Sequence, residues 1–577
     1  MILEGERNEM TEEKSDNQNL VSYILEMLQT WMDAVLEIGN YQKKKEIEKG
    51  RWIVFDLKEA LQTVKRVIEQ KTEDYWKVFS IRCENCLESL NGILKNIEEG
   101  EIEKVGNKLE FELLPFFRIA YICLYYDGVI KGDEKKEERF WEEEAVELCK
   151  NYYIEQGMKT GVYKYDLTIY ILAYNNLGYT KLCVESVLQY LPRTIRCELI
   201  LINHGSNDGT KEYFETIDPE KQIDIKINGL DGFVIAPFIA EGEFVLNISN
   251  DVILTANVVE LMLQCMKEDS QIACVVPITP NIENLQSISP EEIQYENIDE
   301  LKRVAKKFNR REFKKEENRV RLLTPIYMFR TEYWSNSQKT KLSAEKLLKT
   351  KTFMFGDDVS SLCFRRAGYK NILMKDIYCY HFGSKTVGKN GHDFLIGRKL
   401  FYERYGVDAW EKGVCWSFEL FKRLLCEKAD AKRILGINGG MGGNSLKIKE
   451  ELKERVGNIQ VKLINYTMDK RFLADLQGIS DYAYYIENWE ALFQVLEGEF
   501  DYILLSGGLE GNLNYQEYLE RFYQYLTKHG VIIFQSSEKS QVDWFEQQYR
   551  GVKRAQDREM VCCKEEEQIQ YYAFCKK

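Results

Sequence analysis

The sequence has little proline and little cysteine for its length. It holds 8 prolines in 577 residues, whereas ~5% is usual, so we expect no proline-rich spacer between domains. The 15 cysteines are scattered and far fewer than the ~8–10% of a disulfide scaffold, which is typical of reduced thiols in a cytoplasm. A chain this long buries a full core without disulfides, and its length suggests roughly three or four domains.

Long hydrophobic runs and an excess of positive charge are also missing. The longest apolar stretch, 113–126, has about 14 residues, and a helix needs ~20 to span a bilayer. The first residues, MILEGERNEMTEEK, lack the cationic start and apolar run of a secretion signal. A net charge of −14 argues against nucleic-acid binding, which needs a basic surface. We therefore expect a soluble, cytoplasmic protein without a transmembrane segment or a nucleic-acid partner.

Hydrophobic periodicity divides the chain into three blocks. Residues 1–163 repeat apolar positions at the spacing of one helix face, which predicts an all-α block. Residues 164–416 alternate short apolar runs with helical stretches, which predicts crossover connections and a mostly parallel sheet. A linker helix is expected over 417–430, and residues 431–577 predict a second, smaller α/β domain with a Gly-rich turn after its first strand.

In the middle block, the predicted strands end in polar turns. The expected strands are Leu167–Leu172, Glu198–Ile202, Phe244–Ile248, Ile272–Val276 and Ile377–Tyr380. The expected helices are Thr180–Tyr190, Asp208–Ile217, Val258–Lys267 and Leu362–Ala367. Ligands of open parallel sheets bind beyond the carboxyl ends of the strands. The turns after the first three strands are therefore the expected place of a ligand site.

These turns and two later segments carry the candidate site residues. The turns hold Ala173, Tyr174, Asn175, Asn203, Ser206, Asp208, Asn250 and Asp251, and the later segments hold Asp357, Asp358 and His381. Taken singly, each has a simpler explanation, because Asn, Gly, Ser and Asp favour turns and two aspartates suit a helix N-terminus. Taken together at one end of a sheet, they predict a site for phosphate, metal and a base.

In this region the sequence resembles the family 2 glycosyltransferases of the GT-A fold. The segments that carry the resemblance are ILAYNNLGYTKLCVESVLQY, ELILINHGSNDGTKEYF, GEFVLNISNDVIL, FMFGDDVSSLCFRRAGYK, YHFGSKT and RKLFYERYGVDAW. They occur in the family's order over about 250 residues. The resemblance implies a GT-A nucleotide-sugar-binding, Rossmann-like domain in which the polar turns from Ala173 to Asn250 bind the donor.

The resemblance also implies roles for the acidic residues. A divalent cation, Mn²⁺ or Mg²⁺, would stabilise the diphosphate leaving group, with Asp251 and His381 as its ligands. Asp358 would be the base that deprotonates the acceptor hydroxyl, with Asp357 as the alternative. One base on the acceptor face implies inversion at the anomeric carbon. The chain departs from the family at Asn203, where an acidic residue usually reads the nucleotide base, and at Ser249, the first acidic position of the DxD motif.

The C-terminal block resembles the Rossmann-type methyltransferases that use S-adenosylmethionine. The resemblance is carried by ILGINGGMGGNSLKIKEEL and by EFDYILLSGGLEGNLNYQEYLERFYQYLTKHGVIIF. Gly436, Asn438 and Asn465 replace two acidic residues and the first glycine of that family. We therefore expect a degenerate domain with a structural or acceptor-handling role and without S-adenosylmethionine as a cofactor; a working methyltransferase is the alternative.

These expectations combine into one hypothesis and two rivals. The hypothesis is a metal-dependent, inverting hexosyltransferase that moves a sugar from a nucleotide-diphosphate donor, with UDP favoured, to a hydroxyl acceptor. The acceptor would be a bacterial surface glycan or a protein such as flagellin, by analogy alone. The rivals are a bifunctional glycosyl- and methyltransferase, and a non-catalytic scaffold of GT-A shape that binds a nucleotide or a partner protein.

Overall fold

The computed structural model describes most of the chain. The described residues are 2–226, 231–282, 284–287, 296–310, 315–335, 341–348, 355–383, 391–409, 431–457, 460–506, 514–536, 556–557 and 570–576. Contacts divide the chain into two compact units. The first unit comprises 1–253, 328–353 and 384–389, and the second comprises 254–327, 354–383 and 390–577. The domain limits expected from the sequence stay a prediction.

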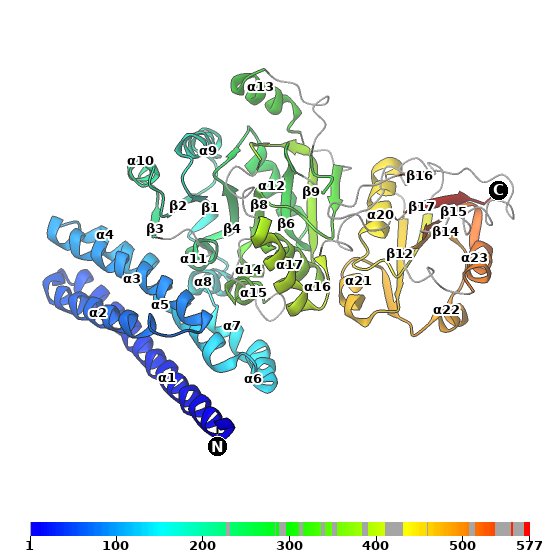
Figure 1. Ribbon diagram of the computed structural model, residues 1–577. Coiled ribbons are helices and arrows are strands. Elements are labelled where there is room, and N and C mark those ends of the chain that lie inside the picture. The colour runs from blue at the N-terminus through cyan, green and yellow to red at the C-terminus, as the bar shows by residue number, and fades with distance from the viewer. Residues whose placement is uncertain are drawn as a thin grey trace. The chain divides into compact units, whose positions relative to one another are not determined.

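The N-terminal part of the first unit is helical, as predicted (Figure 1). Its α-helices are α1 (Ile2–Lys43), α2 (Ile47–Ile68), α3 (Asp74–Glu99), α4 (Ile102–Lys108), α5 (Leu114–Tyr125), α6 (Glu134–Arg139), α7 (Ala145–Leu148) and α8 (Tyr152–Thr160). Three π-helical turns join them, η1 (Leu109–Leu113), η2 (Tyr126–Ile130) and η3 (Phe140–Glu144). In α2 the buried Leu57, Leu61, Val64 and Ile68 form the apolar stripe that the periodicity predicted.

One helical run in this block is more apolar than the others. By length and composition, Ile102–Ile130 is the one run among the described residues that meets the criteria for crossing a membrane, with a mean hydropathy of 1.4. It is longer than the apolar stretch read from the sequence because helical turns flank that stretch on both sides. Within it, α5 packs against α1 and α3, and Phe117 and Ile122 are fully buried. Packing inside the helical block thus accounts for much of its hydrophobicity.

The α/β part of the first unit contains a parallel sheet. Its strands are β1 (Tyr165–Ala173), β2 (Cys197–His204), β3 (Lys221–Ile225) and β4 (Gly242–Ser249), in the order β3-β2-β1-β4. A short strand β5 (Val252–Ile253) follows, and the helices are α9 (Leu177–Tyr190), α10 (Thr210–Ile217), α11 (Asp231–Ile239), α14 (Thr331–Ser335) and α15 (Leu342–Leu348). The three strands and two helices predicted here are confirmed, whereas β3 and α11 were not predicted.

The second unit begins with another group of strands. Its strands are β6 (Ile272–Ile278), β7 (Glu316–Asn318), β9 (Lys370–Tyr378) and β10 (Tyr380–His381), and β8 (Ile326–Arg330) holds residues of both units. The helices are α12 (Val258–Glu268), α13 (Ile298–Phe308), α16 (Gly356–Arg366) and α17 (Gly391–Tyr405). β9 pairs in parallel with β6 and antiparallel with β7, so the sheet is mixed. β9 also begins earlier and ends two residues sooner than the strand predicted for 377–380.

The C-terminal part of this unit is a second Rossmann-like sheet with the order β13-β12-β11-β14-β15-β17-β16. The strands are β11 (Ala431–Ile437), β12 (Gln460–Thr467), β13 (Tyr482–Tyr485), β14 (Phe500–Leu505), β15 (Leu526–Ser536), β16 (Gln556–Asp557) and β17 (Gln570–Cys575). The first five are parallel and β17 is antiparallel to both of its neighbours. The predicted smaller α/β domain is confirmed, and the linker helix over 417–430 lies outside the described residues.

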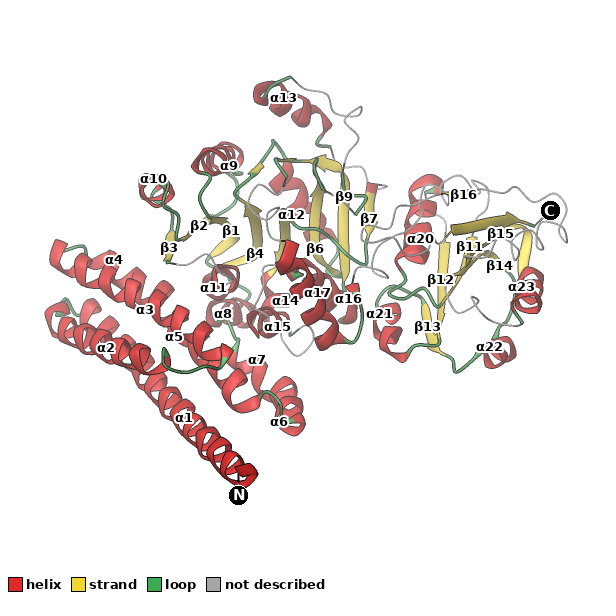
Figure 2. Ribbon diagram, viewed as in Figure 1, coloured by secondary structure: helices red, strands yellow, loops and turns green. Residues whose placement is uncertain are grey.

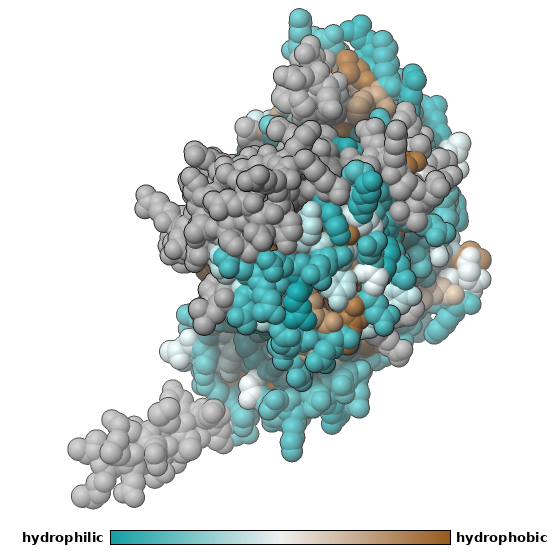
Figure 3. Space-filling model, turned by 90° about the vertical axis from the view of Figure 1, so that its right-hand side faces the viewer, coloured by the Kyte–Doolittle hydropathy of each residue, from teal (hydrophilic) through white to brown (hydrophobic). Residues whose placement is uncertain are grey.

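Helices cover both faces of this C-terminal sheet (Figure 2). They are α20 (Gly443–Val456), η5 (Lys470–Phe472), α21 (Leu473–Gln477), α22 (Trp489–Val495) and α23 (Tyr515–Gln524). α22 and α23 supply aromatic residues to one core cluster, in which Trp489 and Phe522 are buried with Phe500. Among the residues coloured by hydropathy in Figure 3, hydrophilic ones predominate and the hydrophobic patches are small.

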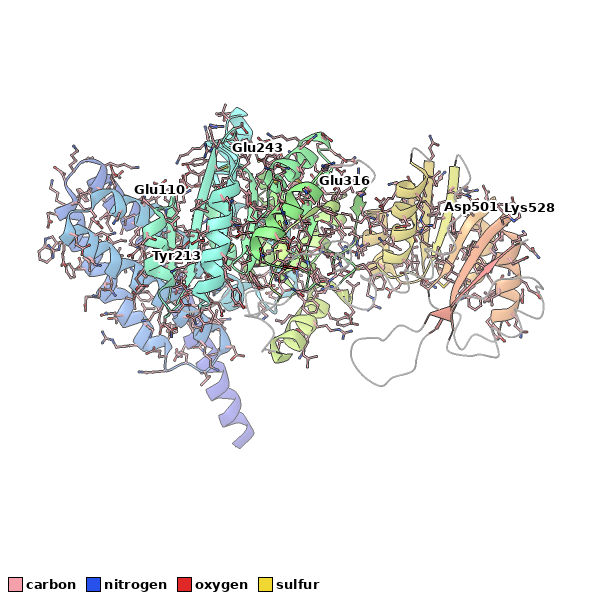
Figure 4. All side chains as sticks on the ribbon, turned by 90° about the horizontal axis from the view of Figure 1, so that it is seen from above. Glu110, Tyr213, Glu243, Glu316, Asp501 and Lys528 are labelled. Atoms are coloured by element: carbon pink, nitrogen blue, oxygen red, sulfur yellow. The ribbon has the colours of Figure 1, made fainter. Side chains whose placement is uncertain are left out.

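Strand β7 carries a buried carboxylate in a cluster of cations. Glu317 is 2% exposed and its neighbour Glu316, labelled in Figure 4, is less buried. Lys447 of α20 lies 2.6 Å from both Glu317 oxygens, and Arg319 lies 2.6 Å from one of them. Burial alone would raise the pKa of Glu317, but the charges of Arg319, Lys447 and Lys375 lower it from 4.5 to about 2.

We expect Glu317→Gln to lower the free energy of unfolding by about 3–5 kcal/mol at pH 7, because it leaves buried cations without their carboxylate. A carboxyl whose pKa is lowered in the folded state stabilises the fold above its unfolded pKa. That contribution is present above pH 4.5 and is lost as the pH falls towards about 2. Chemical denaturation at several pH values measures it. The variant should lose part of the acid-dependent slope, and Glu316→Gln, the matched control, should stay within about 1 kcal/mol of wild type.

Candidate active site

Hydrogen bonds join the turns that follow β1 and β2. Ala173 ends β1 beside Asn203 of β2 in parallel register. The Asn175 amide donates to Ser206 Oγ at 2.9 Å, and the Asn207 amide donates to Asn175 Oδ1 at 2.9 Å. Asn175 has a φ of 50°, a left-handed conformation that asparagine adopts more readily than most residues. The two predicted nucleotide-binding turns therefore form one hydrogen-bonded edge of the sheet.

Asn203 is buried, and its amide is bonded inside the protein. Its Oδ1 accepts the Ser206 amide at 3.0 Å, and its Nδ2 donates to Asp224 Oδ1 at 3.3 Å. Asp224 lies beside Asn203 in the register of β2 and β3. The carboxylate that the sequence lacks at 203 is thus present on the adjacent strand. The alternating pattern KQIDI around Asp224 was the overlooked signal of strand β3. Tyr174, in the turn after β1, is half-buried.

Asp208 joins the same turn to the first turn of α9. Its carboxylate accepts the Leu177 amide at 2.8 Å and the Thr210 hydroxyl at 2.6 Å. Partial burial would raise the pKa of Asp208, but the hydrogen bonds from the Thr210 hydroxyl and from the Leu177 and Thr210 amides lower it. Asp208 therefore holds two turns together as an anion.

The turn after β4 is tied to α9. Asn250 is buried, and its Nδ2 donates to Thr180 Oγ1 at 3.0 Å and to the Asn175 carbonyl at 3.5 Å. Asp251 follows directly and is 7% exposed. A polar path therefore runs along the carboxyl ends of β1, β2 and β4, with one carboxylate, Asp251, at the end of β4.

The predicted acidic pair lies at the start of α16 in the second unit. Asp358 is buried, and Arg321 binds both of its oxygens, through Nε at Oδ1 and through a second nitrogen at 3.3 Å from Oδ2. Asp357 accepts the Thr324 hydroxyl, and the Thr324 amide donates to it at 3.3 Å. Neither Arg321 nor Thr324 was predicted, because no short-range pattern in the sequence connects them to a helix more than 30 residues later.

The predicted metal ligands belong to different units. Asp251 is in the first unit and His381 in the second, where the His381 carbonyl accepts Asn281 Nδ2 at 2.9 Å. Among the residues that the structure describes, no three His, Cys, Asp or Glu side chains gather into a metal-binding group. A carboxylate oxygen suits Mn²⁺ and Mg²⁺, whereas an imidazole nitrogen suits softer transition metals better than it suits Mg²⁺.

In the C-terminal sheet, the residues at the family's cofactor positions bond within the protein. Asn465 is 1% exposed; its Oδ1 accepts Ser445 Oγ at 3.2 Å, and its Nδ2 donates to Ser480 Oγ at 2.7 Å. Asn438 accepts the Met468 amide at 2.8 Å. Gly436 leaves space that the Asn465 side chain fills. Here the asparagines support the first turn of α20 and the loop after β12.

Comparison with known proteins finds a family match in the central segment. Residues 168–333 match the model of the family described as glycosyl transferase family 2. Two Pasteurella multocida proteins, a chondroitin synthase from strain Pm70 and a hyaluronan synthase, are 31% identical to this chain over 121 residues. That match covers 20% of this chain and 12% of each relative. The chain thus matches only a small part of these longer proteins.

Solved structures of several proteins share weaker likeness. S. aureus TarS 1-349 is 15% identical, with a TM-score of 0.29, over 43% of this chain and 67% of that chain. GalNAc-T7, solved with UDP, GalNAc and Mn²⁺, is 12% identical, with a TM-score of 0.32, over 43% and 48%. A putative O-methyltransferase from Klebsiella pneumoniae is 19% identical, with a TM-score of 0.23, over 30% and 86%. Likenesses at this level carry no functional assignment.

We expect Asp208→Asn to lower the free energy of unfolding by about 1–2 kcal/mol, because hydrogen bonds to a charged acceptor contribute more than neutral ones. The lowered pKa means that the charged form contributes above the ordinary value of 3.8. The difference between wild type and variant should therefore shrink as the pH falls below that value. Urea denaturation at pH 7 and pH 3 measures it. Glu215→Gln on the exposed side of α10 is the control, and an equal loss in both variants would contradict the role of Asp208.

Proposed function

We propose that the chain is a metal-dependent, inverting glycosyltransferase that moves a hexose from a nucleotide-diphosphate sugar to a hydroxyl acceptor in the cytoplasm. The observation that carries the proposal is the polar edge at the carboxyl ends of β1, β2 and β4, within the segment that matches the family. Ligands of parallel sheets bind at this edge. In the proposal, the edge from Ala173 to Asn250 binds the nucleotide and its phosphates.

The donor we favour carries uridine diphosphate. Uracil offers an N–H donor beside a carbonyl, and Asp224 offers an acceptor next to the Asn203 amide. The proposed acceptor is a glycan, because the related segments come from proteins named chondroitin synthase and hyaluronan synthase. A protein hydroxyl, such as one on flagellin, is the second acceptor class.

Chemistry at the acceptor needs a base, and Asp358 is our proposal for it. The bound cation, held by Asp251 and His381, would supply a Lewis acid for the departing diphosphate. The acceptor hydroxyl must lose its proton to a carboxylate within hydrogen-bond reach. Arg321 binds both carboxylate oxygens of Asp358. The acceptor hydroxyl therefore has to share Asp358 with Arg321 or displace Arg321 from it. Asp357, which accepts the Thr324 hydroxyl and the Thr324 amide, is the alternative base.

Two rival functions have an observation in their favour. The strand order of the C-terminal sheet, with its antiparallel β17, favours the bifunctional glycosyl- and methyltransferase. The internal bonds of Asn438 and Asn465 favour a domain that does not use S-adenosylmethionine. Calorimetric binding of that cofactor with a dissociation constant below about 100 μM, or −5.5 kcal/mol, would favour the bifunctional enzyme.

The Arg321–Asp358 pair favours the non-catalytic scaffold, which would bind a nucleotide sugar without releasing the nucleotide.

We expect UDP to raise the melting temperature more with Mn²⁺ than with a chelator, because a ligand that binds the folded state stabilises it by mass action. Asp251→Ala should remove most of that metal-dependent increment, since Ser249 carries no charge to replace it. Thermal-shift titration of UDP with and without Mn²⁺ measures both. Glu243→Gln, on the same strand β4, is the control. A metal increment that survives in Asp251→Ala would remove Asp251 from the site.

We expect Asp358→Asn to slow sugar transfer by about 10²- to 10⁴-fold, the usual contribution of a general base. The affinity for UDP should change by less than about tenfold, because the base acts on the acceptor. Asp357→Asn should be the milder change. Steady-state transfer, with UDP release as the readout, distinguishes the two carboxylates. Their roles exchange if only Asp357→Asn loses transfer, and wild-type rates in both variants would show that neither is the base.

A further inference from the structure

Helix α16 is bonded along its length to the segment Val320–Thr324. Arg365 near the end of the helix donates to the Val320 carbonyl. One turn earlier, Ser361 Oγ accepts the Leu322 amide at 3.1 Å. Arg321 and Thr324 then bind Asp358 and Asp357 at the start of the helix. The orientation of the acidic pair therefore depends on how this whole ladder of bonds is held.

The C-terminal domain holds the far end of that ladder through one buried aspartate. Asp475 of α21 is fully buried. Its Oδ1 accepts two nitrogens of Arg365, with Nε at 3.1 Å, and its Oδ2 accepts Arg366 at 2.7 and 3.2 Å. Arg365 is itself only 2% exposed. A guanidinium in such a place needs its carboxylate, because an unpaired buried charge is strongly destabilising.

Two further contacts fit α21 and the Gly-rich turn closely against α16. Gly478, at the end of α21, lies against the Arg365 carbonyl with no room for a Cβ atom. Met441, in the Gly-rich turn after β11, places its sulfur 3.3 Å from Arg365. Met441 and Arg365 also line one small cavity together with Arg321 and Asp358. The C-terminal domain thus forms part of the wall beside the proposed base.

From these contacts we infer that Asp475 and Gly478 are positioning residues of the glycosyltransferase, and that the C-terminal domain serves to hold α16 and its acidic pair. Asp358 and Arg365 are seven residues apart, two turns on the same face of a helix. A shift of Arg365 is therefore passed to the Arg321–Asp358 pair through Val320 and Ser361. This inference rests on the proposed function of Asp358 as the base.

The test compares Asp475→Asn and Gly478→Ala in the full chain. Asp475→Asn removes the charge that Arg365 and Arg366 share. Gly478→Ala pushes α21 away from α16 without changing any charge. Glu490→Gln breaks an exposed ion pair with Arg521 of the same domain and is the matched control. Hydrogen exchange of the peptide 355–366 reports on α16, and that of 177–190 reports on α9 in the other unit.

We expect exchange in 355–366 to become at least about tenfold faster in both variants, with 177–190 unchanged, because local opening follows the loss of local contacts. Transfer per UDP-binding site should fall by about 10- to 100-fold, as for a displaced catalytic group, while UDP affinity stays within about twofold. Asp475→Glu, which keeps the charge, should restore part of the transfer. Glu490→Gln should match wild type in every measurement.

Three results would overturn the inference. Unchanged exchange in 355–366 would show that α21 does not hold α16. Equal acceleration in 355–366 and 177–190, with normal transfer per UDP-binding site, would reduce Asp475 to a stabilising residue. Faster exchange in 355–366 with full transfer would separate α16 from the chemistry. A wild-type protein that neither binds UDP nor transfers sugar would instead contradict the proposed function, and the exchange result would still decide whether α21 holds α16.

Discussion

Turns at the carboxyl end of a parallel sheet carry backbone groups that no strand satisfies, and this constraint shapes the polar edge along β1, β2 and β4. Here the chain meets it with side chains from neighbouring turns. Asn175 and Ser206 bond across two turns, and Asp208 reaches the start of α9. Asn250 then joins the turn after β4 to the same helix. The residues predicted from the sequence as ligand contacts thus also hold the turns of this edge together by hydrogen bonds.

Much of the fold could be predicted because its signals are local. Apolar periodicity in α2, the alternation of strands and helices after Tyr165 and the Gly-rich turn after β11 each depend on a few adjacent residues. Strand β3 was missed because it is short and half polar, although its Asp224 accepts a hydrogen bond from Asn203 at the polar edge. The π-helical turns between α4 and α7 have no sequence signature that distinguishes them from α-helix, so a helical block was all that could be predicted.

The candidate residues were proposed from the sequence, whereas their bonding partners were not. Asp357 and Asp358 were found from their place before a helix, but Arg321 and Thr324 lie on a loop whose course the sequence does not reveal. The same holds for Asp475, whose ion pair with Arg365 joins positions 110 residues apart. Such pairs depend on tertiary packing, because a buried charge pairs with whichever opposite charge the fold places near it.

The C-terminal domain combines a Rossmann-like sheet with polar side chains that bond inside the protein. The strand order of its sheet fits a Rossmann domain. At the position where the methyltransferases have an acidic residue, this chain has Asn465, which bonds to Ser445 and Ser480 inside the protein. Its buried charges are directed elsewhere, Lys447 to Glu317 of β7 and Asp475 to the arginines of α16. Replacing a buried ion pair by well-packed apolar residues is often neutral, whereas removing one partner of the pair is strongly destabilising. In this unit Asp475 contacts the helix that carries Asp357 and Asp358, so the C-terminal domain would act on the proposed reaction through α16.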